Sequence, residues 1–311
     1  MAEVLVGLTV ASVVVFGVGT GFVWVTKSWT DTQMRLQSQQ SLRVSIETIN
    51  REVRLAGVCM NPATAQPLTP EYAPISGTHG TTDTITIISN PACAGPANIT
   101  ADCNACASIT IASVGNFTAG TWAYAYDGDG TTTPPGPTGE YFLIQSISGN
   151  TLTVDPIKLL TKHYPVSNSS VWGADQRVLA IDSACTGCNG VPSLTLQMLG
   201  GILGGQPLVR GVDSLSVQYV LNRLYSTDTT KCNSQTLGTS SLCVVNQPTV
   251  APSIAGDWQI VRAMIFTIGA RSIVKVRASG SADGYLHLSE TVEVSPRNLI
   301  YQQSRLPWTP Y

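Results

Sequence analysis

The chain has 311 residues and a formal net charge of −2, and only 12% of its residues are charged. A balance so close to neutral argues against a nucleic-acid-binding or polybasic membrane-binding protein. Hydrophobic residues make up 43% of the chain, which excludes a disordered protein and is enough for one large or two small domains beside a long helix.

The first expected element is one long helix over residues 1–57. Residues 4–26 carry no charge, and as a helix of about 34 Å they can cross a hydrocarbon core of about 30 Å. Beyond Lys27, apolar residues recur at steps of three and four, which is typical of a helix face packed on a domain. This stripe consists of Leu42, Ile46, Ile49 and Val53. We therefore expect three parts, namely a transmembrane or filament-core half at 1–27, an amphipathic half at 28–57 and a β-rich head at 58–311.

Two features of the apolar half are not required in a helix that only anchors a domain in a membrane. Glu3 places an acid at the start of the anchor, where lipid makes a charge costly. The helix dipole offsets this cost in part, and the α-amino group of a neighbouring copy offsets it better. Gly17, Gly19 and Gly21 each cost about 1 kcal/mol relative to Ala in a helix. They indicate either a segment that stretches or unwinds among other helices, or a surface on which helices pack closely.

Alternating polar and apolar residues predict an antiparallel β-rich head. The helix stripe is expected to cover the apolar face of this sheet, which gives an α+β fold with disulfide-stapled loops. The expected strands lie at 83–88, 108–112, 122–126, 140–147, 151–155, 177–181, 193–198, 214–221, 258–268, 272–278 and 286–294.

The eight cysteines all lie in the head, and their even number favours disulfides in an oxidising compartment. The pairing of Cys232 with Cys243 is the one we expect first, because it closes a loop of about a dozen residues. The other six are Cys59, Cys93, Cys103, Cys106, Cys185 and Cys188. The two CxxC pairs at 103–106 and 185–188 favour local disulfides, with a four-cysteine zinc site and redox chemistry as alternatives.

No other motif predicts catalysis or a resident cofactor. Asp127 and Asp129 form an acidic loop that is a weak candidate for calcium, but its spacing is not that of an EF-hand, and a solvated turn accounts for it better. The three histidines are scattered and have no neighbouring pattern of carboxylates or cysteines. We therefore expect a protein that is not an enzyme and binds no cofactor.

Four stretches carry a resemblance to a known family. They are NREVRLAG at 50–57, LVRGVDSLSVQY at 208–219, WQIVRA at 258–263 and VSPRNL at 294–299. Together with the apolar helix start and its Glu3, they resemble type IV pilins and pseudopilins, most of all the PilW-type minor pilins. In that family the Glu follows four residues of the mature chain, whereas here it is the third residue, so either the sequence starts two residues late or its register differs from that of the family.

The resemblance implies a non-enzymatic structural subunit of a type IV pilus-like filament, either a minor priming subunit or one that forms the filament body. Such a subunit waits in the inner membrane and then moves into an extracellular filament, with Glu3 setting the axial register. Its partners are other pilin subunits and the pilus assembly machinery of the inner membrane, and no nucleic acid. The alternatives are a type II secretion pseudopilin and a membrane-tethered extracytoplasmic binding protein that never polymerises. An extracytoplasmic redox or zinc enzyme is the weakest alternative.

Overall fold

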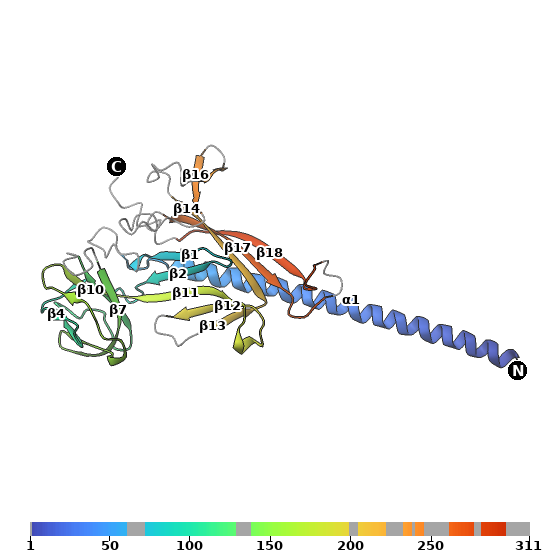
Figure 1. Cartoon of the computed structure of the whole chain (residues 1–311). Coiled ribbons are helices and arrows are strands. Elements are labelled where there is room, and N and C mark those ends of the chain that lie inside the picture. Colours follow the sequence, from blue (N-terminus) through green and yellow to red (C-terminus); the bar gives the residue numbers. More distant parts are fainter. Residues whose placement is uncertain are drawn as a thin grey trace.

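One long helix and several antiparallel sheets make up the part of the chain that the computed structural model describes. This part comprises residues 2–60, 72–128, 138–198, 205–221, 233–237, 240–245, 261–276 and 281–296. The helix α1 runs without a break from Ala2 to Leu55. Its first half projects away from the rest of the molecule, and its second half lies among the strands (Figure 1).

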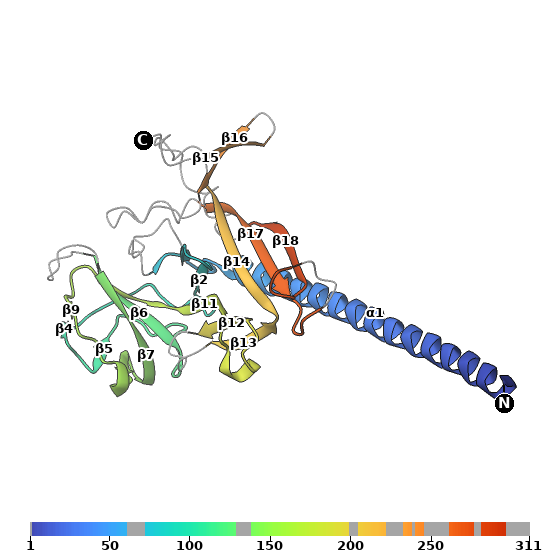
Figure 2. The same ribbon diagram turned by 45° about the vertical axis from the view of Figure 1, so that its right-hand side comes forward.

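Two five-stranded sheets, which we call the body, surround the second half of α1. The first has the order β1-β2-β11-β12-β13 and the second the order β15-β16-β14-β17-β18. Both sheets share one hydrophobic core with α1 and curl around it (Figure 2). The first sheet contains β1 (Ile75–Thr78), β2 (Thr84–Ser89), β11 (Asp175–Asp182), β12 (Ser193–Met198) and β13 (Gln206–Arg210). The second contains β14 (Val212–Leu221), β15 (Asn233–Leu237), β16 (Ser240–Val245), β17 (Val261–Arg271) and β18 (His287–Val294).

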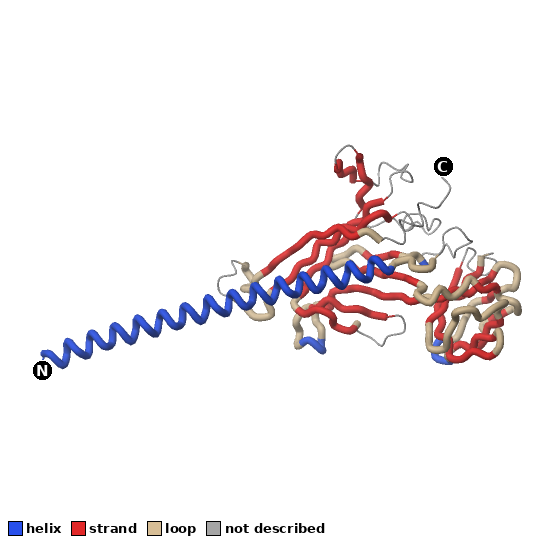
Figure 3. The backbone as a smooth tube through the Cα atoms, turned by 180° about the vertical axis from the view of Figure 1, so that it is seen from behind, coloured by secondary structure: helices blue, strands red, loops and turns tan. Residues whose placement is uncertain are grey.

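Residues 90–174, which we call the insert, form a separate unit between two neighbouring strands of the body. Ser89 at the end of β2 pairs with Asp175 at the start of β11, so the chain leaves and rejoins the body at one place. The insert lies at the end of the body opposite to the projecting helix (Figures 1 and 3). Its six-stranded sheet has the order β3-β10-β6-β7-β8-β5, and β4 pairs with β9. The strands are β3 (Ala97–Asn98), β4 (Cys103–Asn104), β5 (Ser108–Thr110), β6 (Trp122–Asp127), β7 (Thr138–Ser148), β8 (Thr151–Val154), β9 (His163–Tyr164) and β10 (Ser169–Gly173).

The expected α+β fold, in which the helix covers one sheet of the head, is wrong. The head consists mainly of antiparallel strands, and the six-stranded sheet of the insert buries a core to which α1 contributes no residue. The reason is that this sheet curls on itself, since Ile99 beyond β3 forms a bridge with Ile111 beyond β5 and brings its two edges together. Apolar side chains of a curled sheet cover one another and need no helix. They include Ile99, Ile109, Ile111, Phe142, Ile144, Leu152 and Val171.

Aromatic side chains join the insert to the body. The Tyr72 ring stacks on Tyr124 of β6 with 4.7 Å between the ring centroids, and its hydroxyl donates a hydrogen bond of 2.7 Å to the carbonyl of Gly173. Trp172 of β10 and Met60 are buried in the same cluster. The insert is therefore packed against the body through a cluster distinct from both main cores.

Several expected strands agree with the structure, and one expectation fails. The strand expected at 272–278 is a turn in its described part, 272–276, because β17 continues to Arg271 and the chain then reverses into β18. The short strand β10 at 169–173 was not expected, since its sequence SSVWG shows only a weak alternation.

Candidate assembly helix

The first half of α1 exposes nearly all of its apolar side chains. Every described side chain from Val6 to Thr30 is exposed, including those of Phe16 at 74% and Trp24 at 72%. This segment is long and apolar enough to cross a membrane. In water an exposed apolar surface of this length is unfavourable, so the segment has to be covered by lipid or by other protein.

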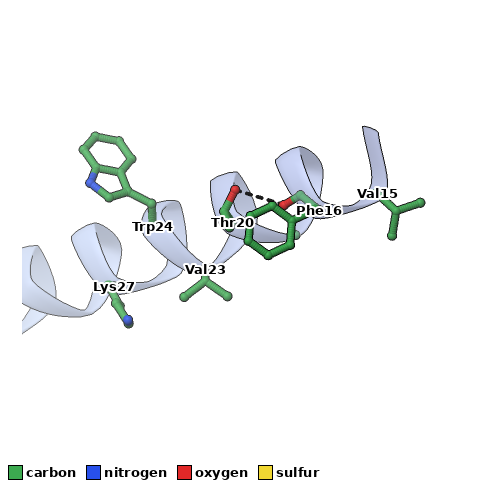
Figure 4. A pocket seen from close by; sticks show the side chains of 7 residues that line it. Val15, Phe16, Thr20, Val23, Trp24 and Lys27 are labelled. Atoms are coloured by element: carbon green, nitrogen blue, oxygen red, sulfur yellow. Dashed lines mark hydrogen bonds between the residues drawn. The ribbon is translucent and has the colours of Figure 1, made fainter. Parts of the chain in front are cut away.

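A shallow groove lies on this exposed helix, between two aromatic side chains. Phe16 and Trp24 border it, and the hydroxyl of Thr20 donates to the carbonyl of Phe16 at 3.0 Å and so turns back onto the helix (Figure 4). Figure 4 shows Trp24 on one side and Val23 and Lys27 on the other. The groove is lined by Val15, Phe16, Gly19, Thr20, Val23, Trp24 and Lys27. Its floor is low because Gly19 has no side chain.

The glycines of the projecting half have no role in the fold of a single chain. Apart from the backbone of its own helical turns, a Cβ atom added at Gly17, Gly19 or Gly21 would meet no atom within 4 Å, and the helix is continuous through all three. Each glycine nevertheless costs about 1 kcal/mol relative to Ala. Both explanations of this cost stay predictions, namely close packing against another helix and a segment that stretches or unwinds among other helices.

Glu3 lies in the first turn of α1. Its side chain is outside the described part of the structure, so its pairing with a neighbouring amino terminus stays a prediction.

The second half of α1 is held in the body by the expected stripe and by a buried charge that was not expected. Leu42, Ile49 and Val53 are buried in the shared core, and Ile46 packs against it. The Glu52 side chain is also fully buried. Its carboxylate accepts hydrogen bonds from Arg177 of β11 at 2.7 Å and from Arg51 at 2.9 Å.

The Glu52 contact belongs to a small ionic network between α1 and the first sheet. Arg177 also donates to Asp175 at 2.8 Å. Burial disfavours the charge of Arg177, but its hydrogen bonds to Asp175 and Glu52 outweigh this effect and raise its pKa. Glu52 follows Ile49 by three residues and therefore lies on the same, packed face of the helix. This spacing is the one feature of the sequence that indicates the buried position of Glu52.

In the described residues of the head three disulfides are present, and two of them rule out the shared zinc site. The bonded pairs are Cys59 with Cys93, Cys103 with Cys106, and Cys185 with Cys188. Each CxxC pair thus closes on itself, so the four thiols do not form one metal site. The pairing of Cys232 with Cys243 falls on side chains outside the described residues.

The acidic loop near Asp127 is not arranged as a metal site in the described residues. Asp127 is buried at the end of β6, and Asp129 lies outside the described part. Glu140 instead accepts hydrogen bonds from Thr161, the Lys162 amide and the Tyr164 hydroxyl. In the residues that the structure describes, no group of three or more His, Cys, Asp or Glu side chains is placed to hold a metal ion.

Comparison with known proteins yields only weak structural similarity. The sequence matches no protein-family model and no curated protein. Among solved structures, 32% of the chain is similar to 15% of the Gp54 tailspike of Acinetobacter baumannii bacteriophage AP22, at 19% identity and a TM-score of 0.23. A second similarity covers 26% of the chain and 14% of the tailspike protein gp49 from Pseudomonas phage LKA1, at 19% identity and a TM-score of 0.21. The chain spans less than a sixth of either tailspike, and similarities this low carry no argument about fold or function.

Proposed function

We propose that the protein is a non-enzymatic structural subunit of a type IV pilus-like filament, which polymerises through the first half of α1. The observation that carries this proposal is a projecting apolar helix whose glycines serve no contact within the chain. The four sequence stretches that resemble PilW-type minor pilins support it as well.

Assembly would be driven by burial of the exposed apolar side chains between neighbouring helices. The groove around Gly19 can receive an apolar side chain of a neighbour, since Phe16 and Trp24 form its walls. Glu3 would set the axial register, because a carboxylate buried among helices without a cationic partner costs about 3–5 kcal/mol, and a neighbouring amino terminus supplies that partner. The partners are other pilin subunits and, before assembly, the assembly machinery of the inner membrane.

The location of the protein would change with its state. The apolar helix and the disulfides are consistent with a membrane anchor and a head in an oxidising extracytoplasmic space. In the assembled state the helix would move into the filament core, and the head would lie on the filament surface.

Immunoelectron microscopy of sheared surface filaments from the native cell tests this proposal. We expect the wild-type protein on filaments, and the Glu3→Ala variant confined to the inner membrane. The matched control is Glu47→Ala, which removes an exposed acid from the other half of the same helix and should leave filament incorporation unchanged.

If wild-type protein is found in the membrane as single copies and is absent from filaments, the protein is a tethered binding protein. If Glu3→Ala enters filaments as well as the wild type does, the register role of Glu3 is wrong.

A further inference from the structure

Among the described residues of the head, those that connect β17 to β18, 271–276 and 281–286, lie closest to the projecting half of α1, and we call them the turn. Figures 1, 2 and 3 agree that these described residues reach farther along the helix toward its N-terminus than the described strands of the first sheet do. α1 contacts both β17 and β18. Along the helix, Asp31 and Met34 are the first described side chains that are partly buried, so contact between helix and head begins at this level.

The level at which the head begins lies close to where the surface of a bilayer would be if the uncharged run of α1 spanned it. The uncharged run ends at Thr26, and the five residues from there to Asp31 rise about 7.5 Å. The headgroup region of one leaflet is about 5–8 Å thick. Trp24, Lys27 and Trp29 are exposed at this end of the run, as expected for side chains that mark the membrane interface.

The side chains of the turn suit such a surface. Val274 is 55% exposed although it is apolar, and the exposed Lys275 follows it. The Tyr285 ring lies under two cations, with the Arg271 guanidinium 4.5 Å and the Lys275 ammonium 5.7 Å from its centroid. An apolar tip flanked by an aromatic ring and cations is typical of protein surfaces that rest on lipid headgroups.

The carboxylates near the turn are engaged with groups other than these cations. Asp283 accepts hydrogen bonds from the Ser281 hydroxyl at 2.6 Å and the Tyr285 amide at 3.0 Å, and it lies 2.8 Å from Nε2 of His287. Asp213 lies 3.0 Å from Nδ1 of the same histidine. Within the described residues no carboxylate is paired with Arg271 or Lys275, so their positive charges can meet an external anion.

We propose that this turn docks on the membrane while the subunit is anchored, with Val274 in the interfacial layer and Arg271 and Lys275 on the phosphates of anionic lipids. The inference rests on the membrane-anchored stage of the proposed function. Docking would fix the orientation of the head relative to the membrane surface before assembly, and it has to be released when the subunit is extracted.

Hydrogen exchange of the full chain in lipid nanodiscs tests the docking. The discs contain either zwitterionic lipid alone or an added fraction of anionic lipid, and detergent micelles serve as the reference. We expect slower exchange of residues 271–276 in the anionic discs than in micelles. A Val274→Ser and Lys275→Glu double variant should exchange at least about fivefold faster in those discs, the factor that one cationic contact with an anionic surface contributes.

The matched control applies the same chemical change at the far end of the molecule. Ile157 and Lys158 in the insert are an exposed apolar residue and an adjacent lysine, and Ile157→Ser with Lys158→Glu should leave the exchange of 271–276 unchanged. One outcome is that residues 271–276 exchange equally in zwitterionic discs, anionic discs and micelles, while the protein resists carbonate extraction from vesicles. In that case the docking proposal is wrong, but the proposed membrane anchor is retained. If carbonate removes the protein from vesicles, both the docking and the membrane stage of the proposed function fall.

Discussion

The two halves of α1 cover their apolar side chains in opposite ways. From residue 38 onward the packed face lies in the core of the body, where Ile49 and Val53 are fully buried. From Val6 to Thr30 every described side chain is exposed, although this half is the more apolar of the two. In one continuous helix, the second half is buried by strands of its own chain. The first half has to be buried by other molecules.

This difference assigns separate roles to substitutions in the two halves. Changes in the buried half should alter the free energy of unfolding of the head, because they act on a packed core. Changes in the projecting half should leave the head intact and alter only membrane anchoring or assembly. This distinction would be wrong if substitutions in the projecting half changed the free energy of unfolding of the head. It would also be wrong if substitutions in the buried half left that free energy unchanged.

The largest expected effect comes from the ionic network that holds the buried half. Arg177→Met removes the main partner of the fully buried Glu52, and leaving a buried charge without its partner costs about 3–5 kcal/mol. Urea unfolding followed by circular dichroism measures this loss. The control is Arg51→Met, because the Arg51 side chain is 69% exposed and its contact with Glu52 is worth far less. Equal losses in both variants would contradict a dominant role of Arg177.

A pair of matched truncations compares the two halves directly. Ile49→Ala empties part of the shared core and should lower the free energy of unfolding by about 3 kcal/mol. Val14→Ala removes a side chain that is 56% exposed and should change the stability of the head by less than about 0.5 kcal/mol. Both are measured on detergent-solubilised protein. A loss of more than 1 kcal/mol for Val14→Ala, roughly twice that limit, would show that the projecting half packs within the chain.

The sequence was sufficient to predict α1, because a long uncharged run that continues into helical spacing is typical of one unbroken helix. The stripe from Leu42 to Val53 was predicted for the same reason. Many strands with clear alternation were also predicted, such as β14, where Leu215, Val217 and Tyr219 point to the core.

What the sequence did not reveal is which surfaces meet. The insert was missed because its boundaries, Ser89 and Asp175, are adjacent only in the folded sheet. The partnership of Glu52 with Arg177 joins residues 125 positions apart, and a single sequence does not encode such a pairing in its local pattern. The fold class was wrong for this reason, since local periodicity predicts strands but not how their sheets curl.

Low pH should destabilise the insert more than the core of the body that holds α1. Burial raises the pKa of Glu140, but hydrogen bonds from Thr161, Lys162 and Tyr164 outweigh it, so the net shift is downward from 4.5. A lowered pKa in the folded state contributes stability above pH 4.5, and this contribution is lost as the pH falls through the folded value. We expect the insert to lose stability below about pH 4.5 while contacts of Ile49 persist, as followed by hydrogen exchange between pH 6 and pH 3. Glu140→Gln should flatten this dependence, and an unchanged acid response in that variant would contradict the assignment.

The smallest effect on the stability of the head is expected at Gly19, and this substitution is the sharpest test of the projecting half. Gly19→Ala adds a methyl group that meets no atom of its own chain, and the higher helix propensity of Ala should favour the helix by about 1 kcal/mol. The head should therefore be unaffected, and anchoring in the membrane should persist. Filament incorporation should nevertheless fall, because the methyl group fills the groove between Phe16 and Trp24. Gly7→Ala, which makes the same change on the same helix outside the groove, should reduce incorporation less. Equal incorporation of wild type and Gly19→Ala would show that the groove receives no neighbour, and that its glycine is not kept for close packing between helices.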